Sequence, residues 1–273
     1  MLKSRVITAC VLIAILFSIL FLMPYQGFVV ADLVVFTLAA WEWSNLAGSL
    51  PLWQRVVYAV FFPIVLFPLS GLVGAASVWF LPVLFLVVLG WGIALLMLWR
   101  YPDHVGWYRT DLMLGIGVWL LLPAAVGLLV LHRMASGSSL ILLLVAVIAV
   151  SDIGAYFCGR RFGRHKLAVR ISPGKTWEGF WGGICSSLVL AVLVGFFSRI
   201  PSLDFFLFCI VLVGTAAVSV VGDLFESMVK RERGVKDSGQ LLPGHGGVLD
   251  RIDGWTAAVP FFTLCYLVTG RLL

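Results

Sequence analysis

Residues 77–98, SVWFLPVLFLVVLGWGIALLML, form an apolar stretch without a charged side chain. A helix needs about 20 mainly apolar residues to cross the hydrocarbon core of a membrane, and this stretch meets that requirement. The whole chain has the same character: 62% of its 273 residues are hydrophobic and 12% are charged, and its mean hydropathy is +1.08. The sequence therefore predicts an integral membrane protein rather than a soluble globular one.

Nine apolar segments are predicted to span the membrane, and the third of them is short and contains Pro63 and Pro68. We expect an all-α, polytopic integral membrane protein with about nine transmembrane helices and two polar cytoplasmic loops, which would form any active site because nearly everything else is apolar. Residues 1–135 would supply N-terminal transmembrane helices, and residues 136–273 a C-terminal transmembrane region that contains both long polar loops and so would be the catalytic region of an enzyme. The predicted spans are residues 6–23, 28–49, 56–70, 77–98, 112–131, 138–158, 178–198, 203–222 and 255–272.

The basic residues predict the orientation, since Lys and Arg favour cytoplasmic loops. With nine spans and a cytoplasmic N-terminus, only Arg133, Arg199 and Arg271 of the 19 basic residues fall outside, which leaves 16 on the cytoplasmic face. That face would meet anionic lipid headgroups and nucleotides. Nucleic acid is a poor candidate partner, because no soluble domain is available to read it.

Two acidic residues lie within or beside apolar segments, where an unpaired carboxylate is unfavourable. Glu42 either has a functional role or simply reaches the membrane interface near the end of its helix. Asp152 lies inside an apolar run that begins near Leu140, and we favour a functional role for it. Small residues beside it, such as Gly154 and Gly159, would let another helix approach closely.

The segment Ile171-Ser-Pro-Gly-Lys-Thr-Trp-Glu-Gly179 precedes the seventh predicted span. Its Gly-Lys-Thr sequence imitates the end of a Walker A loop, but the glycine required five residues earlier is a valine here, so a P-loop is rejected. We expect Ser172 or Thr176 to cap the following helix, so that its N–H groups and Lys175 face an anion. Glu178 is expected to be either a helix-dipole or capping partner, or a ligand.

Carboxylates recur at a spacing of i, i+3 near the ends of the last two spans. Asp223 and Glu226 share one helix face if the eighth helix continues, and Asp250 and Asp253 repeat the spacing before the ninth span. Oxygen ligands without clustered Cys or His suit Mg²⁺ or a similar hard cation. A pair of such ions could activate an attacking oxygen and neutralise the leaving group of a phosphoryl or nucleotidyl transfer.

A cationic run and a glycine-rich turn lie between these carboxylates. Lys230, Arg231, Arg233 and Lys236 would serve as a positive-inside anchor if taken alone, but their position among acidic groups favours a role with phosphates. Residues 243–247, Pro-Gly-His-Gly-Gly, would form a tight turn whose backbone approaches a phosphate closely. His245 is a phosphate hydrogen-bond donor, an acid/base group or a turn residue, and we favour the first.

The polar stretch from Ser227 to Asp253 resembles the signature of the phosphatidate cytidylyltransferases, also called CDP-diacylglycerol synthases. The segments around Asp152 and from Ser172 to Glu178 are similar to further segments of that family, so the resemblance covers the second half of the chain well. In the first half it extends only to several hydrophobic spans. The matching positions are Ser227, Lys230, Arg231, Lys236, Asp237, His245, Gly246, Gly247, Asp250, Arg251 and Asp253.

The resemblance implies a multi-pass enzyme of the bacterial-type inner (cytoplasmic) membrane, often homodimeric, that uses Mg²⁺, CTP and phosphatidic acid to make CDP-diacylglycerol and pyrophosphate. Together with the residue patterns it suggests three sets of site residues. The catalytic set is Asp223, Lys230, Arg231, His245, Asp250 and Arg251. The substrate-binding set is Ser172, Lys175, Thr176, Ser227, Lys236, Gly246 and Gly247. The metal-binding set is Asp152, Asp223, Asp250 and Asp253, with two expected cation positions.

The expected mechanism is direct displacement, in which a phosphatidic acid oxygen attacks the α-phosphorus of CTP. No Ser-His-Asp or Cys-His arrangement indicates a covalent enzyme intermediate. Two enzymatic alternatives are a CTP-dependent lipid-alcohol kinase and a CDP-alcohol phosphotransferase, although the Asp pattern of the latter cannot be placed in this chain. A third alternative, from a different class, is an ion-coupled membrane transporter whose intramembrane acids bind cations.

Overall fold

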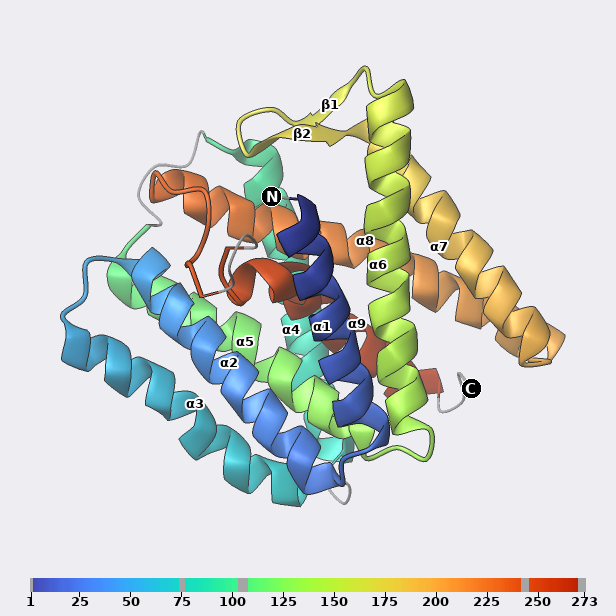
Figure 1. Ribbon diagram of the computed structural model, residues 1–273, viewed down its shortest axis with the longest axis horizontal. Helices are drawn as coiled ribbons and strands as arrows, with labels where there is room; N and C mark the ends of the chain where they lie inside the picture. Colours follow the sequence, from blue (N-terminus) through green and yellow to red (C-terminus); the bar gives the residue numbers. More distant parts are fainter. Residues whose placement is uncertain (1, 74–76, 103–107, 242–245, 270–273) are drawn as a thin grey trace.

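The computed structural model describes residues 2–73, 77–102, 108–241 and 246–269. Within these ranges the chain forms helices and one two-stranded antiparallel sheet (Figure 1). The elements are α1 (Leu2–Phe21), α2 (Tyr25–Ala47), α3 (Leu52–Leu72), α4 (Ser77–Arg100), α5 (Thr110–His132), α6 (Gly137–Phe162), β1 (Lys166–Ala168), β2 (Ser172–Thr176), α7 (Trp177–Phe197), α8 (Ser202–Glu232) and α9 (Leu249–Thr269).

The predicted all-α polytopic membrane fold is confirmed. Eight of the described helices, α2 to α9, are long and apolar enough to cross a membrane. The short third span is a full helix, since α3 runs through both Pro63 and Pro68. Many large apolar side chains, such as Phe67, Trp99 and Phe197, are exposed on the outer faces of the bundle. Such exposure suits a hydrocarbon environment, where an apolar surface costs nothing.

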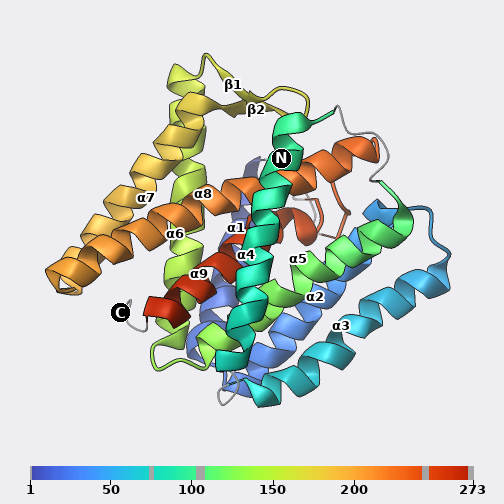
Figure 2. The same ribbon diagram turned by 180° about the vertical axis from the view of Figure 1, so that it is seen from behind.

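The eighth helix is longer than the sequence predicts. We expected a span at residues 203–222, whereas α8 has 31 residues and continues to Glu232. It runs obliquely across the bundle, behind α6 in Figure 1 and in front of it in Figure 2. The continuation places Asp223, Glu226 and Lys230 on successive turns of one helix, so that these side chains point to a common region.

Small residues set the close helix contacts, as we expected beside Asp152. A Cβ atom added to Gly183 of α7 would lie 2.8 Å from the backbone oxygen of Ser151 in α6. In the same way, a Cβ atom on Gly222 of α8 would lie 2.6 Å from the backbone oxygen of Asp253 in α9. Glycine therefore brings α6 against α7, and α8 against α9, at the depth where the acidic residues lie.

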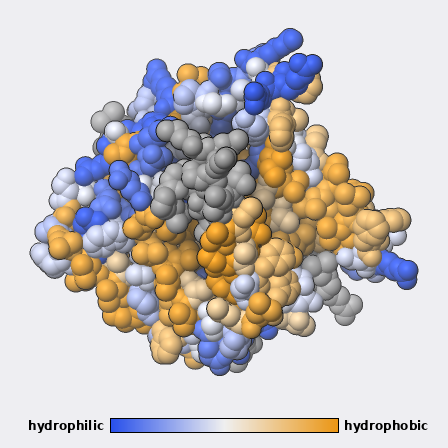
Figure 3. All heavy atoms as spheres, viewed as in Figure 1, coloured by the Kyte–Doolittle hydropathy of each residue, from blue (hydrophilic) through white to orange (hydrophobic). Residues whose placement is uncertain are grey.

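The loop between α6 and α7 contains a β-hairpin, which was not expected from the sequence. Strand β1 pairs with β2 in antiparallel register, with Lys166 opposite Thr176 and Ala168 opposite Ser172. The backbone N–H of Trp177 donates to the carbonyl oxygen of His165 at 2.9 Å and closes the hairpin at the start of α7. Hydrophilic surface gathers over this hairpin and along the same edge of the molecule (Figure 3).

Candidate active site

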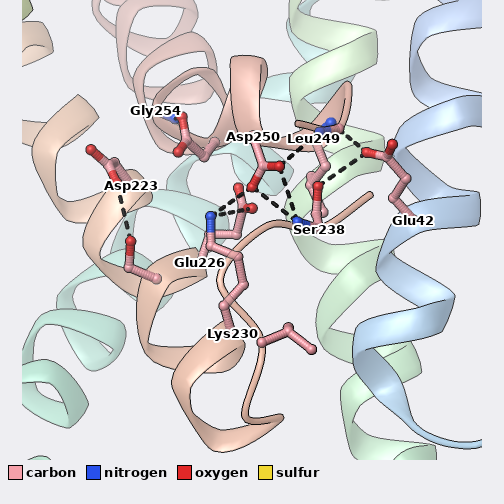
Figure 4. Close-up of polar contacts among 12 residues, drawn as sticks. Glu42, Asp223, Glu226, Lys230, Ser238, Leu249, Asp250 and Gly254 are labelled. Atoms are coloured by element: carbon pink, nitrogen blue, oxygen red, sulfur yellow. Dashed lines mark hydrogen bonds and ion pairs between the residues drawn. The ribbon is translucent and has the colours of Figure 1, made fainter. Parts of the chain in front are cut away.

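A buried lysine links α8 to the start of α9. Lys230 is 7% exposed, and its Nζ atom lies 3.0 Å from Glu226 Oε1 and 2.7 Å from Asp250 Oδ1 (Figure 4). Glu226 lies one helical turn before the lysine, whereas Asp250 comes from α9. A charged amine can be buried when carboxylates surround it. The lysine therefore holds the two helix ends together inside the protein.

Asp250 also organises the loop that joins α8 to α9. Its Oδ1 and Oδ2 atoms accept the backbone N–H of Ser238 at 3.1 and 3.0 Å, and Oδ2 accepts the N–H of Gly247 at 2.8 Å. Gly246 has a φ of +83°, a conformation that favours glycine. A Cβ atom there would also lie 2.7 Å from Asp250 Oδ2. The glycines thus let the loop backbone close around this carboxylate.

Glu42 brings the first half of the chain into the site. It is 1% exposed on α2, and its Oε2 atom accepts hydrogen bonds from Ser238 Oγ at 3.1 Å and from the backbone N–H of Leu249 at 2.8 Å (Figure 4). The second bond satisfies a backbone donor at the N-terminus of α9. Of the two readings of Glu42 as a functional or an interfacial residue, its burial favours the first. Ser238 was missed, because a single serine in a polar loop carries no sequence signal.

A second ion pair joins the hairpin to α8. Lys175 of β2 forms a short contact with Asp223 Oδ2, and Ser227 Oγ donates to Asp223 Oδ1 at 3.3 Å. Thr176, at the end of the same strand, is the N-cap of α7, and its Oγ1 accepts the N–H of Gly179 at 3.1 Å. The predicted cap is therefore confirmed, and the cap fixes the strand that carries Lys175.

Two cavities meet at Asp152. The smaller, of about 150 Å³, is lined by Asp152, Asp223, Asp253 and Arg251 together with apolar and small residues of α6, α8 and α9. The larger, of about 330 Å³, lies between α6, the hairpin and α7 and is lined by Asp152, Lys175, Arg160 and Thr176 among others. The charged residues that line the smaller cavity are three carboxylates and one cation, whereas those that line the larger cavity are two cations and one carboxylate.

The four predicted metal ligands divide into two groups. Asp152, Asp223 and Asp253 line the smaller cavity, and carboxylate oxygens are the donors that Mg²⁺ prefers. Asp250 lies apart from them, with both oxygens accepting hydrogen bonds from the loop. Within the described ranges no three His, Cys, Asp or Glu residues already form a group that could hold a metal ion. Only the residue types of this set, which are all carboxylates, fit Mg²⁺.

The remaining predicted site residues have different environments. Arg231 donates to two backbone oxygens, from Nε to Ile171 at 3.1 Å and from Nη1 to Val235 at 3.2 Å, so it joins α8 to the hairpin. Lys236 is exposed, and Ser172 is half-buried on β2. Both carboxylate oxygens of Glu178 accept the backbone N–H of His165 at 3.2 Å, and Oε1 also lies 2.6 Å from His165 Nδ1. It is therefore a partner of the hairpin, and His245 lies outside the described residues.

The fold and the site together define a polytopic membrane enzyme with paired cations and carboxylates at one end of its helix bundle. The chain belongs to the cytidylyltransferase family, whose model matches residues 3–269, and it is therefore a nucleotidyltransferase. It is 43% identical to a phosphatidate cytidylyltransferase of Pseudomonas aeruginosa over 271 residues, which cover 99% of this chain and 98% of the relative. It is 42% identical to a phosphatidate cytidylyltransferase of Haemophilus influenzae over 284 residues, which cover 97% and 99%.

Proposed function

We propose that this enzyme transfers the cytidylyl group of CTP to phosphatidic acid and so makes CDP-diacylglycerol and pyrophosphate for phospholipid biosynthesis. The observation that carries the proposal is the nearly full-length similarity to two proteins named phosphatidate cytidylyltransferase. The site suits the reaction, because one substrate is a soluble polyanion and the other is a lipid anion. Cations beside a membrane-embedded cavity can bind both.

In the proposed reaction a phosphate oxygen of phosphatidic acid attacks the α-phosphorus of CTP. A new P–O bond forms, the bond between the α-phosphorus and the bridging oxygen breaks, and pyrophosphate leaves with the bonding electron pair. Lys175 and Arg251, which line the two cavities, would neutralise the phosphates. Lys230 is enclosed by two carboxylates, so it would act by positioning Asp250 rather than by binding phosphate. Catalysis then rests on positioning and charge neutralisation.

Asp152, Asp223 and Asp253 would hold Mg²⁺, with a second cation position of unspecified identity nearby. When bound, the metal supplies positive charge that stabilises the phosphate oxygens of the reacting groups. Asp250 stays a predicted ligand as well, although it would have to exchange a hydrogen bond from Ser238 or Gly247 for the ion. Lys175 pairs with Asp223, so with Asp223 among the residues that would hold the metal, Lys175 would be available to a phosphate of CTP.

The membrane setting and assembly follow from the same proposal. The enzyme would lie in a bacterial inner membrane as a homodimer, with its N-terminus and active site in the cytoplasm, where CTP is available. The bias of basic residues supports this orientation. The lipid would enter sideways between helices and keep its acyl chains within the bilayer.

The test is a product assay with purified protein, CTP, Mg²⁺ and phosphatidic acid. We expect CDP-diacylglycerol and pyrophosphate in equal amounts. Release of CDP with a lipid alcohol would instead indicate the kinase, and ion flux in vesicles without any nucleotide product would indicate the transporter. Asp250→Asn should abolish turnover, because it removes a charge that both Lys230 and the loop require. Asp111→Asn, the same change at an exposed residue, is the control and should keep normal turnover.

A further inference from the structure

A third cavity, of about 530 Å³, lies within the membrane-spanning part of the bundle. Helix α1 covers it on one side, and α2, α5, α6 and α9 form the other walls; Figure 1 shows α1 between α2 and α6. Its lining is almost entirely apolar, with residues such as Leu16, Phe28, Phe36 and Ile141. We call this cavity the α1 groove. None of the proposed catalytic steps uses it, except at one end.

That end adjoins the smaller polar cavity, because the two cavities share lining residues. Ala149, Arg251 and Trp255 line both the α1 groove and the smaller polar cavity that contains Asp152, Asp223 and Asp253. A molecule with an anionic head near Arg251 could therefore extend an apolar tail into the groove without leaving the protein. The connection restricts the occupant to an amphiphile whose charged group belongs in the active site.

The groove also holds a polar group without a partner. Asp32 of α2 is 5% exposed, and neither of its carboxylate oxygens has a hydrogen-bond partner among the described residues. A buried carboxyl group in an apolar environment is costly unless something pairs with it. Asp32 is not among the predicted site residues, although, like Asp152, it is an acidic residue within an apolar span. Its position in the groove points to a ligand with its own polar group.

We propose that the α1 groove binds one acyl chain of the phosphatidic acid substrate and that the carboxyl group of Asp32 donates a hydrogen bond to the ester of that chain. The inference rests on the proposed function, because it assigns the lipid phosphate to the adjoining polar cavity. Ester oxygens are the polar groups that a diacyl tail carries beyond its phosphate and glycerol oxygens, and they only accept hydrogen bonds. Asp32 must therefore supply the proton.

The groove selects lipids by shape rather than by hydrophobic transfer. Bilayer hydrocarbon is as apolar as the groove wall, so moving a chain between them yields little free energy. What the groove determines is which chain fits, and overpacking of a well-packed site is unfavourable. A larger side chain that fills the groove should therefore lower kcat/KM for long-chain substrates and leave kcat/KM for short-chain substrates nearly unchanged.

The first test fills the groove with Ala31→Phe. Ala31 lines the groove, and Val30→Phe, at a neighbouring side chain that is 60% exposed, is the matched control. We expect the ratio of kcat/KM for dioleoyl to that for dihexanoyl phosphatidic acid to fall about tenfold in Ala31→Phe and to stay at the wild-type value in Val30→Phe. The KM for CTP should not change. An unchanged chain ratio in Ala31→Phe would overturn the proposal.

The second test examines Asp32 and serves alone if Ala31→Phe does not fold. Asp32→Leu should raise the KM for dioleoyl phosphatidic acid about fivefold, the effect of one lost hydrogen bond, while its melting temperature stays the same or rises. Asp32→Asn keeps a donor and should restore the wild-type KM. An ether-linked phosphatidic acid, which lacks ester carbonyls, should bind wild type and Asp32→Leu equally.

Two results separate the inference from the function on which it rests. If wild-type protein makes no CDP-diacylglycerol from any phosphatidic acid, the proposed function fails. If wild type is active but Asp32→Leu lowers stability and leaves the lipid KM unchanged, Asp32 is a structural residue and the groove proposal fails alone. If the ratio of the KM for the ether lipid to the KM for dioleoyl phosphatidic acid is the same in wild type and Asp32→Leu, the ester contact is contradicted.

Discussion

At the scale of single residues, buried carboxylates hold the backbone of the α8–α9 loop in place by accepting its N–H groups. Asp250 accepts two loop N–H groups and pairs with Lys230, and Glu42 accepts the N–H of Leu249 from another helix. Each bond is between a charged acceptor and a donor that has little access to water. Such bonds contribute more than neutral ones. The shape of the loop is therefore an electrostatic property of a few buried carboxylates.

Glu42 is expected to position the α8–α9 loop without touching substrate. Glu42→Ala should lower the unfolding free energy by about 2–3 kcal/mol, because Leu249 and Ser238 lose their acceptor. Its kcat/KM for CTP should fall at least about tenfold, the effect of a small misplacement of reacting groups. Glu42→Gln keeps one acceptor oxygen and should retain most of the unfolding free energy and most of the kcat/KM for CTP. Thermal melting and steady-state kinetics in detergent check this, and equal loss in the two variants would contradict it.

At the scale of elements, the crossing of α8 and α9 aligns the acidic residues. Gly222 precedes Asp223, and the ideal Cβ position at Gly222 lies 2.6 Å from the oxygen of Asp253 and 3.2 Å from the Cβ atom of Ala257. The backbone oxygen cannot move without shifting α9. This glycine therefore brings Asp223 and Asp253 to the same cavity, and the geometry of the predicted metal site follows from helix packing.

Gly222→Ala should separate α8 from α9. We expect a loss of about 1–3 kcal/mol in unfolding free energy from overpacking, with a fall in turnover and in the affinity for Mg²⁺ measured by titration. Gly92→Ala is the matched control, since no atom lies within 4 Å of the added Cβ on α4. It should be neutral or stabilise the helix by up to about 1 kcal/mol. Normal Mg²⁺ titration by a folded Gly222→Ala protein would show that the crossing does not position the carboxylates.

At the scale of the whole molecule, the two halves form one bundle. Helices on the two sides of residue 135 contact each other, because α2 contributes Glu42 to the site and α5 packs against α9. On the face shown in Figure 3, polar surface gathers at the end of the bundle that carries the hairpin, and apolar surface covers much of the remainder. This face therefore combines an apolar, membrane-compatible surface with a polar end.

The polar end is expected to face the cytoplasm. In a cysteine-free background, Val169→Cys in the exposed hairpin and Ser136→Cys in the exposed α5–α6 turn provide one reporter for each side. A membrane-impermeant maleimide should label Ser136→Cys in spheroplasts and label Val169→Cys only after permeabilisation. Both substitutions leave the charge unchanged, so they do not disturb the topology signal. The reverse labelling pattern would place the active site outside.

The sequence by itself determined the membrane class, nearly all of the spans, and the polar stretch from Ser227 to Asp253. These features depend on local composition, because hydrocarbon acts on every residue of a helix independently of its neighbours. Capping of α7 by Thr176 was also predictable, since the cap contacts only the next three residues. The third span was recognised in spite of its two prolines, which neighbouring helices allow a membrane helix to contain.

Only the tertiary structure decided which polar residues share a cavity and which contact each other. It separated Asp250 from Asp152, Asp223 and Asp253, and it joined Glu42 to a residue 207 positions away. It also extended α8, folded the α6–α7 loop into a hairpin, and left Asp32 in an apolar groove. These outcomes depend on helix tilt and on where small side chains allow close contact. Such packing involves residues far apart in sequence, so no local sequence pattern predicts it.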